Sequence, residues 1–117
     1  MKITAAVVRE KGQPFQFEEL ELQNPREGEV MVKIAASGVC HTDEVAQQQM
    51  IPVPLPAVLG HEGCGIVEKV GPGVTEFEPG DHVVFSFGSC GHCDSCLAGR
   101  PYACENFNAI NFGGVMS

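Results

Sequence analysis

The sequence predicts a mainly β fold: a compact barrel or sandwich of short strands, with one or two short helices and a metal-binding loop near the C-terminus. Short runs rich in β-branched residues recur between residues 3 and 87. Turn-forming triplets, Gly-Pro-Gly at 71–73 and Pro-Gly-Asp at 79–81, separate such runs. Four of the six cysteines fall within fifteen residues, 90–104, which indicates a loop organised around a metal.

The expected strands follow one another along the chain. Residues 3–8 are apolar and β-branched, and residues 15–22 alternate in polarity with one change of phase. Further strands are expected over residues 30–34, 65–70 and 82–87, each next to a glycine- or proline-containing turn.

One short helix is expected after the strand at 30–34. It begins near His41 or Thr42 and carries Asp43 and Glu44 in an acidic first turn, which suits the positive end of the helix dipole. Little regular structure is expected from Gly88 onward, where the cysteine-rich loop begins.

Composition narrows the class of protein. The 117 residues are enough for one domain, and 44% hydrophobic with 19% charged residues is ordinary for a globular protein. The net charge of −8 disfavours nucleic acid as a partner, because an acidic surface repels phosphate. We find no apolar run of about 20 residues and no secretory signal, so neither membrane insertion nor export is expected. We expect a cytoplasmic location.

The four clustered cysteines form the pattern Cys90-x2-Cys93-x2-Cys96-x7-Cys104. Zinc takes four thiolates tetrahedrally, and a site closed by four cysteines is structural. The two-residue gaps allow tight turns that aim two sulfurs at one point, and the seven-residue gap returns the chain with the fourth ligand. The spacing therefore predicts a structural zinc site.

Alternatives to this zinc site stay open from the spacing alone. A bacterial iron–sulfur pattern has a last gap of three residues followed by proline, whereas here the gap is seven and Glu105 follows Cys104. Two disulfides, or thiols without a ligand, are the alternative that involves no metal, and the spacing favours zinc over it. His92 lies inside the loop as an alternative nitrogen ligand.

A second group contains one cysteine and one histidine. Cys40 begins the segment 40–43, Cys-His-Thr-Asp, and His61 lies in the segment 60–63, Gly-His-Glu-Gly. Catalytic zinc takes three protein ligands and leaves a fourth position open. Cys40 and His61 have carboxylates beside them and suit such a site, although lone residues of these types more often belong to a core.

Together these motifs resemble those of the zinc-dependent medium-chain alcohol dehydrogenases. The matching segments are residues 38–43, 54–56, 60–63, 70–71 and 79–81 and the four cysteines. The resemblance covers residues 1–117 and implies the GroES-like N-terminal part of the catalytic domain, about the first third of a family member. The Rossmann domain that binds NAD or NADP would lie outside this chain.

The resemblance implies a catalytic zinc in addition to the structural one. Cys40 and His61 would be two of its three ligands, and the third, a cysteine, would lie well past position 117. Glu62 would lie behind the zinc as an occasional extra ligand. Asp43 would orient His61, as metal-bound imidazoles usually require.

Further residues receive roles by the same resemblance. Thr42 would take the proton of the alcohol, and His41 would face the cofactor pyrophosphate, as a weaker cation than arginine. Ile51 and Phe87 would line the substrate pocket. Many members carry a histidine where this chain has Val45, so the proton relay to solvent is cut or rerouted. In this respect the chain resembles the aryl-alcohol (benzyl alcohol) dehydrogenases.

The implied function is the NAD- or NADP-dependent oxidation of primary alcohols, aromatic ones among them, to aldehydes. The expected partner is a small alcohol or aldehyde, and the full-length form is expected to be a homo-oligomer. No dinucleotide fingerprint G-x-G-x-x-G occurs, since Gly71-Pro72-Gly73 lacks the third glycine. We therefore expect the chain to be a fragment or a natural truncation that is inactive alone.

Two other functions remain as alternatives. A zinc-stabilised, non-catalytic module that binds a protein partner is compatible with the same fold, because a fold does not fix a function. A medium-chain reductase without catalytic zinc is disfavoured, since Cys40, His61 and Glu62 are all present.

Overall fold

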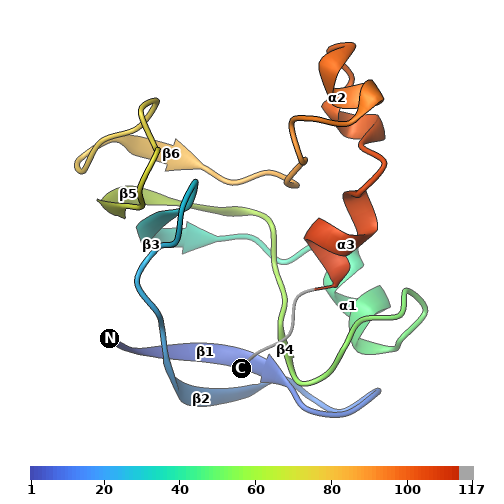
Figure 1. The fold of residues 1–117 in the computed structure, drawn as a ribbon. Coiled ribbons are helices and arrows are strands. Elements are labelled where there is room, and N and C mark those ends of the chain that lie inside the picture. The colour runs from blue at the N-terminus through green and yellow to red at the C-terminus, as the bar shows by residue number, and fades with distance from the viewer. Residues whose placement is uncertain (114–117) are drawn as a thin grey trace. The chain divides into compact units, whose positions relative to one another are not determined.

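The computed structural model describes residues 1–113, and its architecture is mainly β, as the sequence predicts (Figure 1). The elements are, in chain order, β1 (Lys2–Val8), β2 (Gln16–Glu21), β3 (Val30–Ser37), α1 (His41–Gln47), β4 (Ala57–Val58), β5 (Gly63–Val70), β6 (His82–Val84), α2 (Asp94–Leu97), the 3-10 helix η1 (Pro101–Ala103) and α3 (Phe107–Phe112). The strands form two three-stranded sheets, with the orders β2-β1-β4 and β3-β5-β6.

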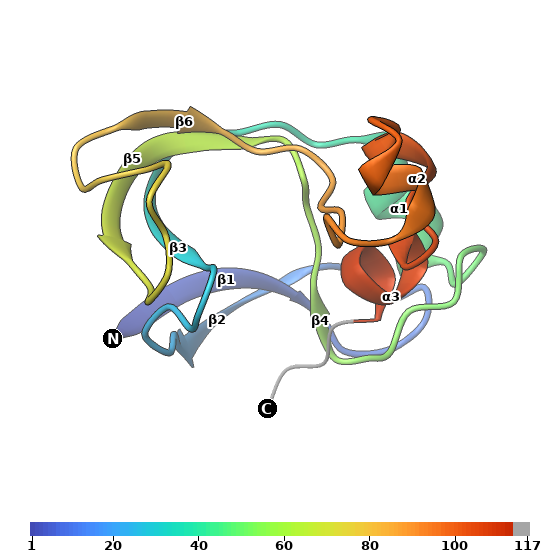
Figure 2. The same ribbon diagram turned by 45° about the horizontal axis from the view of Figure 1, so that its top comes forward.

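The chain divides into two compact units, each built from segments that are distant in sequence. Unit 1 comprises Met1–Ala5, Phe17–Cys40 and Gly60–Ser86. Unit 2 comprises Ala6–Gln16, His41–Leu59 and the segment from Phe87 onward. Unit 1 therefore holds the sheet β3-β5-β6, whose strands lie side by side in Figures 1 and 2. Unit 2 holds every helix found within residues 1–113.

The sheet of unit 1 is antiparallel and brings the end of β3 next to the start of β5. Ser37 pairs with Gly63 at this end of the ladder. Gly65 lies against the carbonyl oxygen of Lys33 so closely that a Cβ would overlap it, and only glycine allows the two strands to approach in this way. Val67 in the middle of β5 is buried. The pairing fixes where the residues that follow β3 and precede β5 must lie.

Unit 2 has a small aliphatic core next to α1. Ala46 of α1 is buried together with Val53 and Ala57. Val7 and Val8, at the end of β1, are fully buried and pair with the short strand β4. The helix begins at His41 and has an acidic first turn, as the sequence predicts.

Two sequence expectations are wrong in extent. The strand expected over 82–87 is only three residues long, since its ladder with β5 ends where Val84 pairs with Cys64. The Phe85 N–H still donates to the Gly63 carbonyl beyond that pair. The region from Gly88 onward is more regular than expected, since it contains α2, η1 and α3. These helices are too short, at six residues or fewer, to leave a periodic pattern in the sequence.

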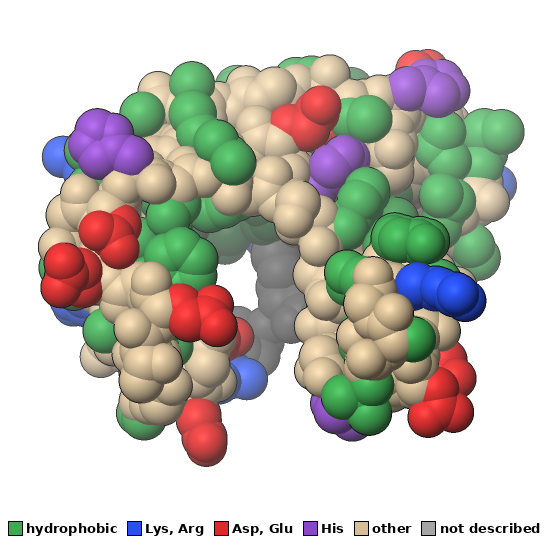
Figure 3. Space-filling model, turned by 90° about the horizontal axis from the view of Figure 1, so that it is seen from above, with side chains coloured by type: hydrophobic (Ala, Val, Ile, Leu, Met, Phe, Trp, Pro, Cys, Tyr) green, Lys and Arg blue, Asp and Glu red, His purple; other side chains and the backbone are tan. Residues whose placement is uncertain are grey.

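The surface agrees with the acidic composition. The net charge is −8, and Figure 3 shows Asp and Glu side chains at several separate places on the face in view. Within residues 1–113, none of the helices has the length and apolar character needed to cross a membrane.

Candidate metal centres

The sulfur atoms of the predicted structural zinc site lie around one point in unit 2. The Sγ atoms of Cys90, Cys93, Cys96 and Cys104 all lie within 4.8 Å of one another. The Cys90–Cys96 and Cys93–Cys104 sulfur pairs are each 3.9 Å apart. A tetrahedral zinc with Zn–S bonds of about 2.3 Å requires sulfur separations of about 3.8 Å. The four side chains therefore fit a single zinc ion.

Backbone N–H groups surround these sulfurs. The Cys90 sulfur accepts hydrogen bonds from the N–H groups of His92, at 3.4 Å, and Cys93, at 3.3 Å. The Cys104 sulfur accepts from the N–H groups of Cys90 and Asn106, both at 3.4 Å. Donors of this kind stabilise a thiolate, which is the form of cysteine that binds metal.

The surroundings lower the pKa values of Cys90 and Cys93 and raise that of Cys96. The backbone N–H of His92 is the main cause that lowers the pKa of Cys90 to about 5. The backbone N–H of Glu105, 3.5 Å from the sulfur, is the main cause that lowers the pKa of Cys93. Burial raises the pKa of Cys96 to about 11. A divalent cation would offset the cost of ionising Cys96, so the donor set is suited to metal binding.

The turns that aim the sulfurs depend on local sequence. Gly91 follows the first ligand with φ of 79°, and Gly99 ends the α2 segment with φ of 77°, a region that glycine enters without strain. The helix α2 begins directly after Cys93 and carries Cys96 in its single turn. The two-residue gaps of the motif are thus folded as one turn each.

The geometry of this loop favours one metal ion among the alternatives. The four cysteines are thiols and form no disulfides. The Nδ1 atom of His92 lies 3.0 Å from the Cys90 carbonyl oxygen, so this ring nitrogen faces the backbone of Cys90 rather than the sulfurs. Sulfurs this close suit one ion, because a four-iron cluster spreads its thiolates over separate irons.

The second group lies in unit 1, where β3 ends and β5 begins. The ligand atoms of Cys40, His61 and Glu62 lie within 4.8 Å of one another. The N–H of Gly38 donates to the Glu62 carbonyl at 2.9 Å and extends the pairing of the two strands past their ends. A Cβ at Gly38 would lie 3.3 Å from the Glu62 side chain, so glycine leaves room for this carboxylate. Antiparallel pairing therefore brings together residues from two separate motifs.

The donors of this second group suit zinc but form an open set. A thiolate, an imidazole and a carboxylate are all ligands that zinc accepts. Cys40 and His61 are half-buried, and Glu62 is exposed. Three protein ligands with access to solvent are typical of a catalytic zinc rather than a structural one. The assignment of these residues as ligands stays a prediction.

The other predicted residues near this motif belong to α1 in unit 2. Asp43 is buried, with 8% of its surface exposed, and Thr42 is half-buried. His41 is exposed, and its Nδ1 lies 3.3 Å from the carboxylate of Glu44, with which it can form an ion pair when protonated. The roles that the resemblance gives to His41, Thr42 and Asp43 stay predictions.

The two residues expected to line a substrate pocket also lie in unit 2. Ile51 is half-buried in the loop before β4. Phe87 is 38% exposed, and its ring centroid lies 5.2 Å from that of Phe107 and 6.1 Å from that of Phe112. Ring separations in this range are favourable, so Phe87 is held by aromatic packing on one side.

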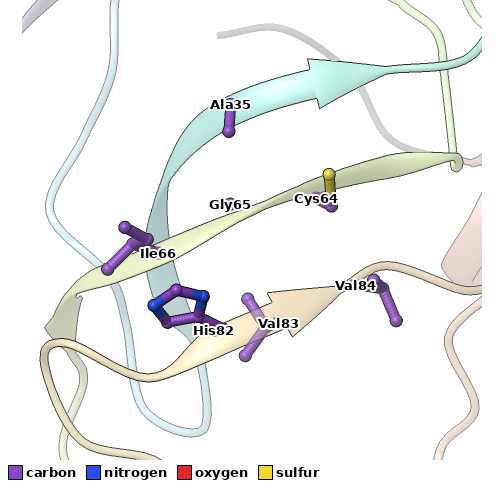
Figure 4. A pocket seen from close by; sticks show the side chains of 7 residues that line it. All are labelled: Ala35, Cys64, Gly65, Ile66, His82, Val83 and Val84. Carbon is purple, nitrogen blue, oxygen red and sulfur yellow. The ribbon is translucent and has the colours of Figure 1, made fainter.

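An apolar hollow of about 430 Å³ lies on the sheet of unit 1 (Figure 4). Cys64 and Ile66 of β5 and His82 and Val84 of β6 are among the side chains that line it. Cys64 is half-buried at this wall. Cys64 and His82 belong to neither group of potential metal ligands found in the described part of the chain.

Residues 26–117 match the family described as the alcohol dehydrogenase GroES-like domain. The chain is 50% identical over 117 residues to the NDMA-dependent alcohol dehydrogenase of Amycolatopsis methanolica, covering 98% of this chain and 31% of that protein. It is 51% identical over 111 residues to the geraniol dehydrogenase of Castellaniella defragrans, covering 95% and 30%. The chain thus spans about a third of the length of these relatives.

Solved structures show the same fold. An alcohol dehydrogenase zinc-binding domain protein from Burkholderia ambifaria superimposes with a TM-score of 0.96 at 51% identity, covering all of this chain and 32% of that one. The benzyl alcohol dehydrogenase of Acinetobacter calcoaceticus superimposes with a TM-score of 0.95 at 50% identity, again with full coverage of this chain and 32% of that one.

Proposed function

Because the chain belongs to the alcohol dehydrogenase GroES-like domain family, we propose that residues 1–117 are the N-terminal, zinc-binding part of an NAD- or NADP-dependent alcohol dehydrogenase. The family resemblance and the mainly β, GroES-like fold class expected from the sequence are confirmed. The proposed reaction is the oxidation of primary alcohols, aromatic ones among them, to aldehydes.

One observation carries this proposal. A chain of the alcohol dehydrogenase family contains both a complete four-thiolate group and a separate group of Cys40, His61 and Glu62. A binding module needs only the first group for stability. The second group has an exposed carboxylate and ligands of mixed type, as a catalytic zinc site would require.

The residues of the second group would hold a catalytic zinc, with a further cysteine ligand from outside this chain, as the family resemblance implies. When bound, the zinc supplies Lewis acidity that lowers the pKa of an alcohol. Cys40 and His61 would fix the ion, and Glu62 would serve as an additional donor, with its exposed carboxylate free to give way to substrate.

Residues of α1 would handle the proton and the cofactor. The Thr42 hydroxyl would accept the alcohol proton, and the carboxylate of Asp43 would keep the His61 imidazole in its ligand tautomer. His41 would face the cofactor pyrophosphate, and its exposure is compatible with contact to an external anion. The side chain of Val45 has no group that can accept or donate a proton. The alcohol proton would therefore reach solvent by a route that does not use residue 45.

The proposed substrate class rests on the pocket residues and on the relatives. Ile51 and Phe87 are apolar and would line the alcohol site, which favours a ring or another large apolar group next to the hydroxyl. Relatives at about 50% identity include a geraniol dehydrogenase and a benzyl alcohol dehydrogenase. We further propose that the complete enzyme is a cytoplasmic homo-oligomer.

The test is an assay of a complete enzyme, meaning residues 1–117 followed by the remaining two thirds of the relatives' length. Reduction of NAD⁺ and NADP⁺ is measured with benzyl alcohol, geraniol and ethanol. The proposal expects oxidation of benzyl alcohol with a higher kcat/KM than that of ethanol. Absence of turnover with all three alcohols, from protein that carries zinc at both groups, would contradict the proposal and favour a protein-binding module.

A further inference from the structure

A pair of reciprocal hydrogen bonds joins two segments of unit 2 that are distant in sequence. The N–H of Gly88 donates to Oδ1 of Asn111 at 2.8 Å, and Nδ2 of Asn111 donates to the Gly88 carbonyl at 2.9 Å. One amide side chain thus satisfies both polar groups of one peptide residue, 23 positions earlier in the chain. We name this arrangement of Asn111 and Gly88 the amide clamp.

The amide clamp is fixed on the side of α3 as well. Nδ2 of Asn111 also donates to the Phe107 carbonyl at 3.0 Å, one helical turn earlier. Both hydrogens of the amide therefore have an acceptor, and the oxygen has a donor, which leaves the side chain one orientation. A Cβ at Gly88 would lie 3.0 Å from Cγ2 of Ile110, so a larger residue at this position would crowd α3.

The clamped residue directly follows Phe87, the aromatic residue proposed for the substrate pocket. The Phe87 ring packs on the rings of Phe107 and Phe112, which lie on the same helix as Asn111, with the latter two centroids 6.2 Å apart. The backbone of Gly88, the next residue along the chain, is thus tied to the helix against which the Phe87 ring packs. With 38% of Phe87 exposed, one part of the residue is held and another part is open to a ligand.

The other end of α3 is tied to the four-cysteine loop. The Phe107 N–H donates to the Cys104 carbonyl at 3.1 Å, and the Asn106 N–H donates to the Cys104 sulfur at 3.4 Å. The start of α3 is therefore bonded to the predicted metal ligand Cys104, and its far end carries Asn111 of the amide clamp. These bonds restrict the movement of the helix and therefore that of Asn111.

We propose that Asn111 is a positioning residue that holds Phe87 as a wall of the alcohol pocket and thereby sets the affinity for alcohols that carry a ring. This inference rests on the proposed function, because the proposed function assigns Phe87 to the pocket. Asn111 acts through Phe87 and need not touch the substrate.

The kinetic test is a double-mutant cycle in the complete enzyme, with Asn111→Ala, Phe87→Ala and the double variant. Asn111→Ala is expected to raise KM for benzyl alcohol by about tenfold, as the loss of the two clamp hydrogen bonds implies, with kcat and the KM for ethanol changed by less than about threefold. If Asn111 acts through Phe87, the double variant has the benzyl alcohol KM of Phe87→Ala alone. Asn108→Ala, at an exposed asparagine of the same helix, is the matched control and should leave both KM values unchanged.

Independent losses that multiply in the double variant, or an unchanged benzyl alcohol KM in Asn111→Ala, would overturn the proposal while leaving the proposed function intact. A second measurement does not need turnover: the ¹⁹F NMR signal of 4-fluorophenylalanine placed at position 87 in the zinc-loaded chain. The proposal expects a shift toward the free amino acid in Asn111→Ala and no change in Asn108→Ala. The same signal in all three proteins would overturn the positioning role even if no alcohol is oxidised.

Discussion

The two potential metal groups of this chain differ in how the sequence builds them. The four cysteines come from one stretch of fifteen residues in unit 2, and backbone N–H groups of that stretch donate to their sulfurs. Cys40, His61 and Glu62 come from two motifs in unit 1 and meet because β3 and β5 pair. The first group is local and closed, whereas the second is assembled by the sheet and is open.

This difference separates stability from reactivity. A closed thiolate set with fixed donors has no position for substrate, so its binding free energy goes into folding. A group with fewer protein ligands of different types binds the metal less tightly, and it leaves one coordination position for water or substrate. Loss of the first group should therefore unfold the region around it, while loss of the second should leave the fold intact and remove activity.

The largest expected effect concerns the chain by itself. Residues 1–117 alone, even with added zinc, are expected to give no measurable NAD⁺ reduction with benzyl alcohol or ethanol. Placement of a nicotinamide next to the alcohol carbon is worth effective molarities of roughly 10⁵–10⁸ M, and the sequence of this chain has no dinucleotide fingerprint to provide it. Absorbance at 340 nm measures this, with the complete enzyme as the positive control, and turnover by residues 1–117 at the rate of that control would contradict the expectation.

The next effect is that of Cys40→Ser in the complete enzyme. Turnover is expected to fall by about 10³-fold or more, because the second group loses its thiolate, while the thermal midpoint changes by less than about 3 °C. Cys64→Ser is the matched control, since Cys64 is also half-buried in unit 1 but outside both groups. Wild-type turnover in Cys40→Ser would remove the catalytic role of the second group.

Cys93→Ser tests the other side of the comparison. The free energy of unfolding is expected to fall by more than about 3 kcal/mol, because one buried zinc ligand is lost and the binding energy of a structural zinc is also folding energy. Chemical denaturation followed by circular dichroism measures the change, and zinc content is measured on the same samples. A stability equal to that of the parent chain would show that the four-cysteine group does not stabilise the fold.

The smallest expected effect is that of Glu62→Gln. The amide keeps the size of the carboxylate but loses its charge, so the affinity of the second group for zinc or cobalt is expected to fall by about tenfold. The four-cysteine group should keep its metal. Titration of the cobalt-substituted protein, followed by its visible absorption, reports the two groups separately. An unchanged affinity of the second group would show that Glu62 is not a ligand.

The four-cysteine site was predictable because all of its information is local. The spacing from Cys90 to Cys104 favours four sulfurs around one metal ion, without knowledge of the rest of the fold. The strands at β1, β3 and β5 were predictable for a similar reason, since runs of β-branched residues between turns need no tertiary information. The β6 strand was predicted too long, because the point at which a ladder ends depends on the partner strand.

Neither the second group nor the amide clamp could be predicted from the spacing of residues in the sequence. The two motifs do not show by themselves that the side chains of Cys40 and His61 lie close together. Only the resemblance to a family predicted that these two residues share a site. The structure adds the reason, which is the pairing of Ser37 with Gly63 and the bond from Gly38 to Glu62. Asn111 left no signal at all, because an asparagine in a six-residue helix looks the same whether or not it holds another segment.

The most direct test of the comparison is the metal content of residues 1–117 after dialysis against a chelator such as EDTA, measured by native mass spectrometry. The account predicts one zinc per chain that survives dialysis, and a second that binds only when zinc is added back. Cys93→Ser should lose the retained zinc, and Cys40→Ser should lose only the exchangeable one. Iron in place of zinc, no retained metal, or a retained zinc that disappears in Cys40→Ser but persists in Cys93→Ser would contradict the account.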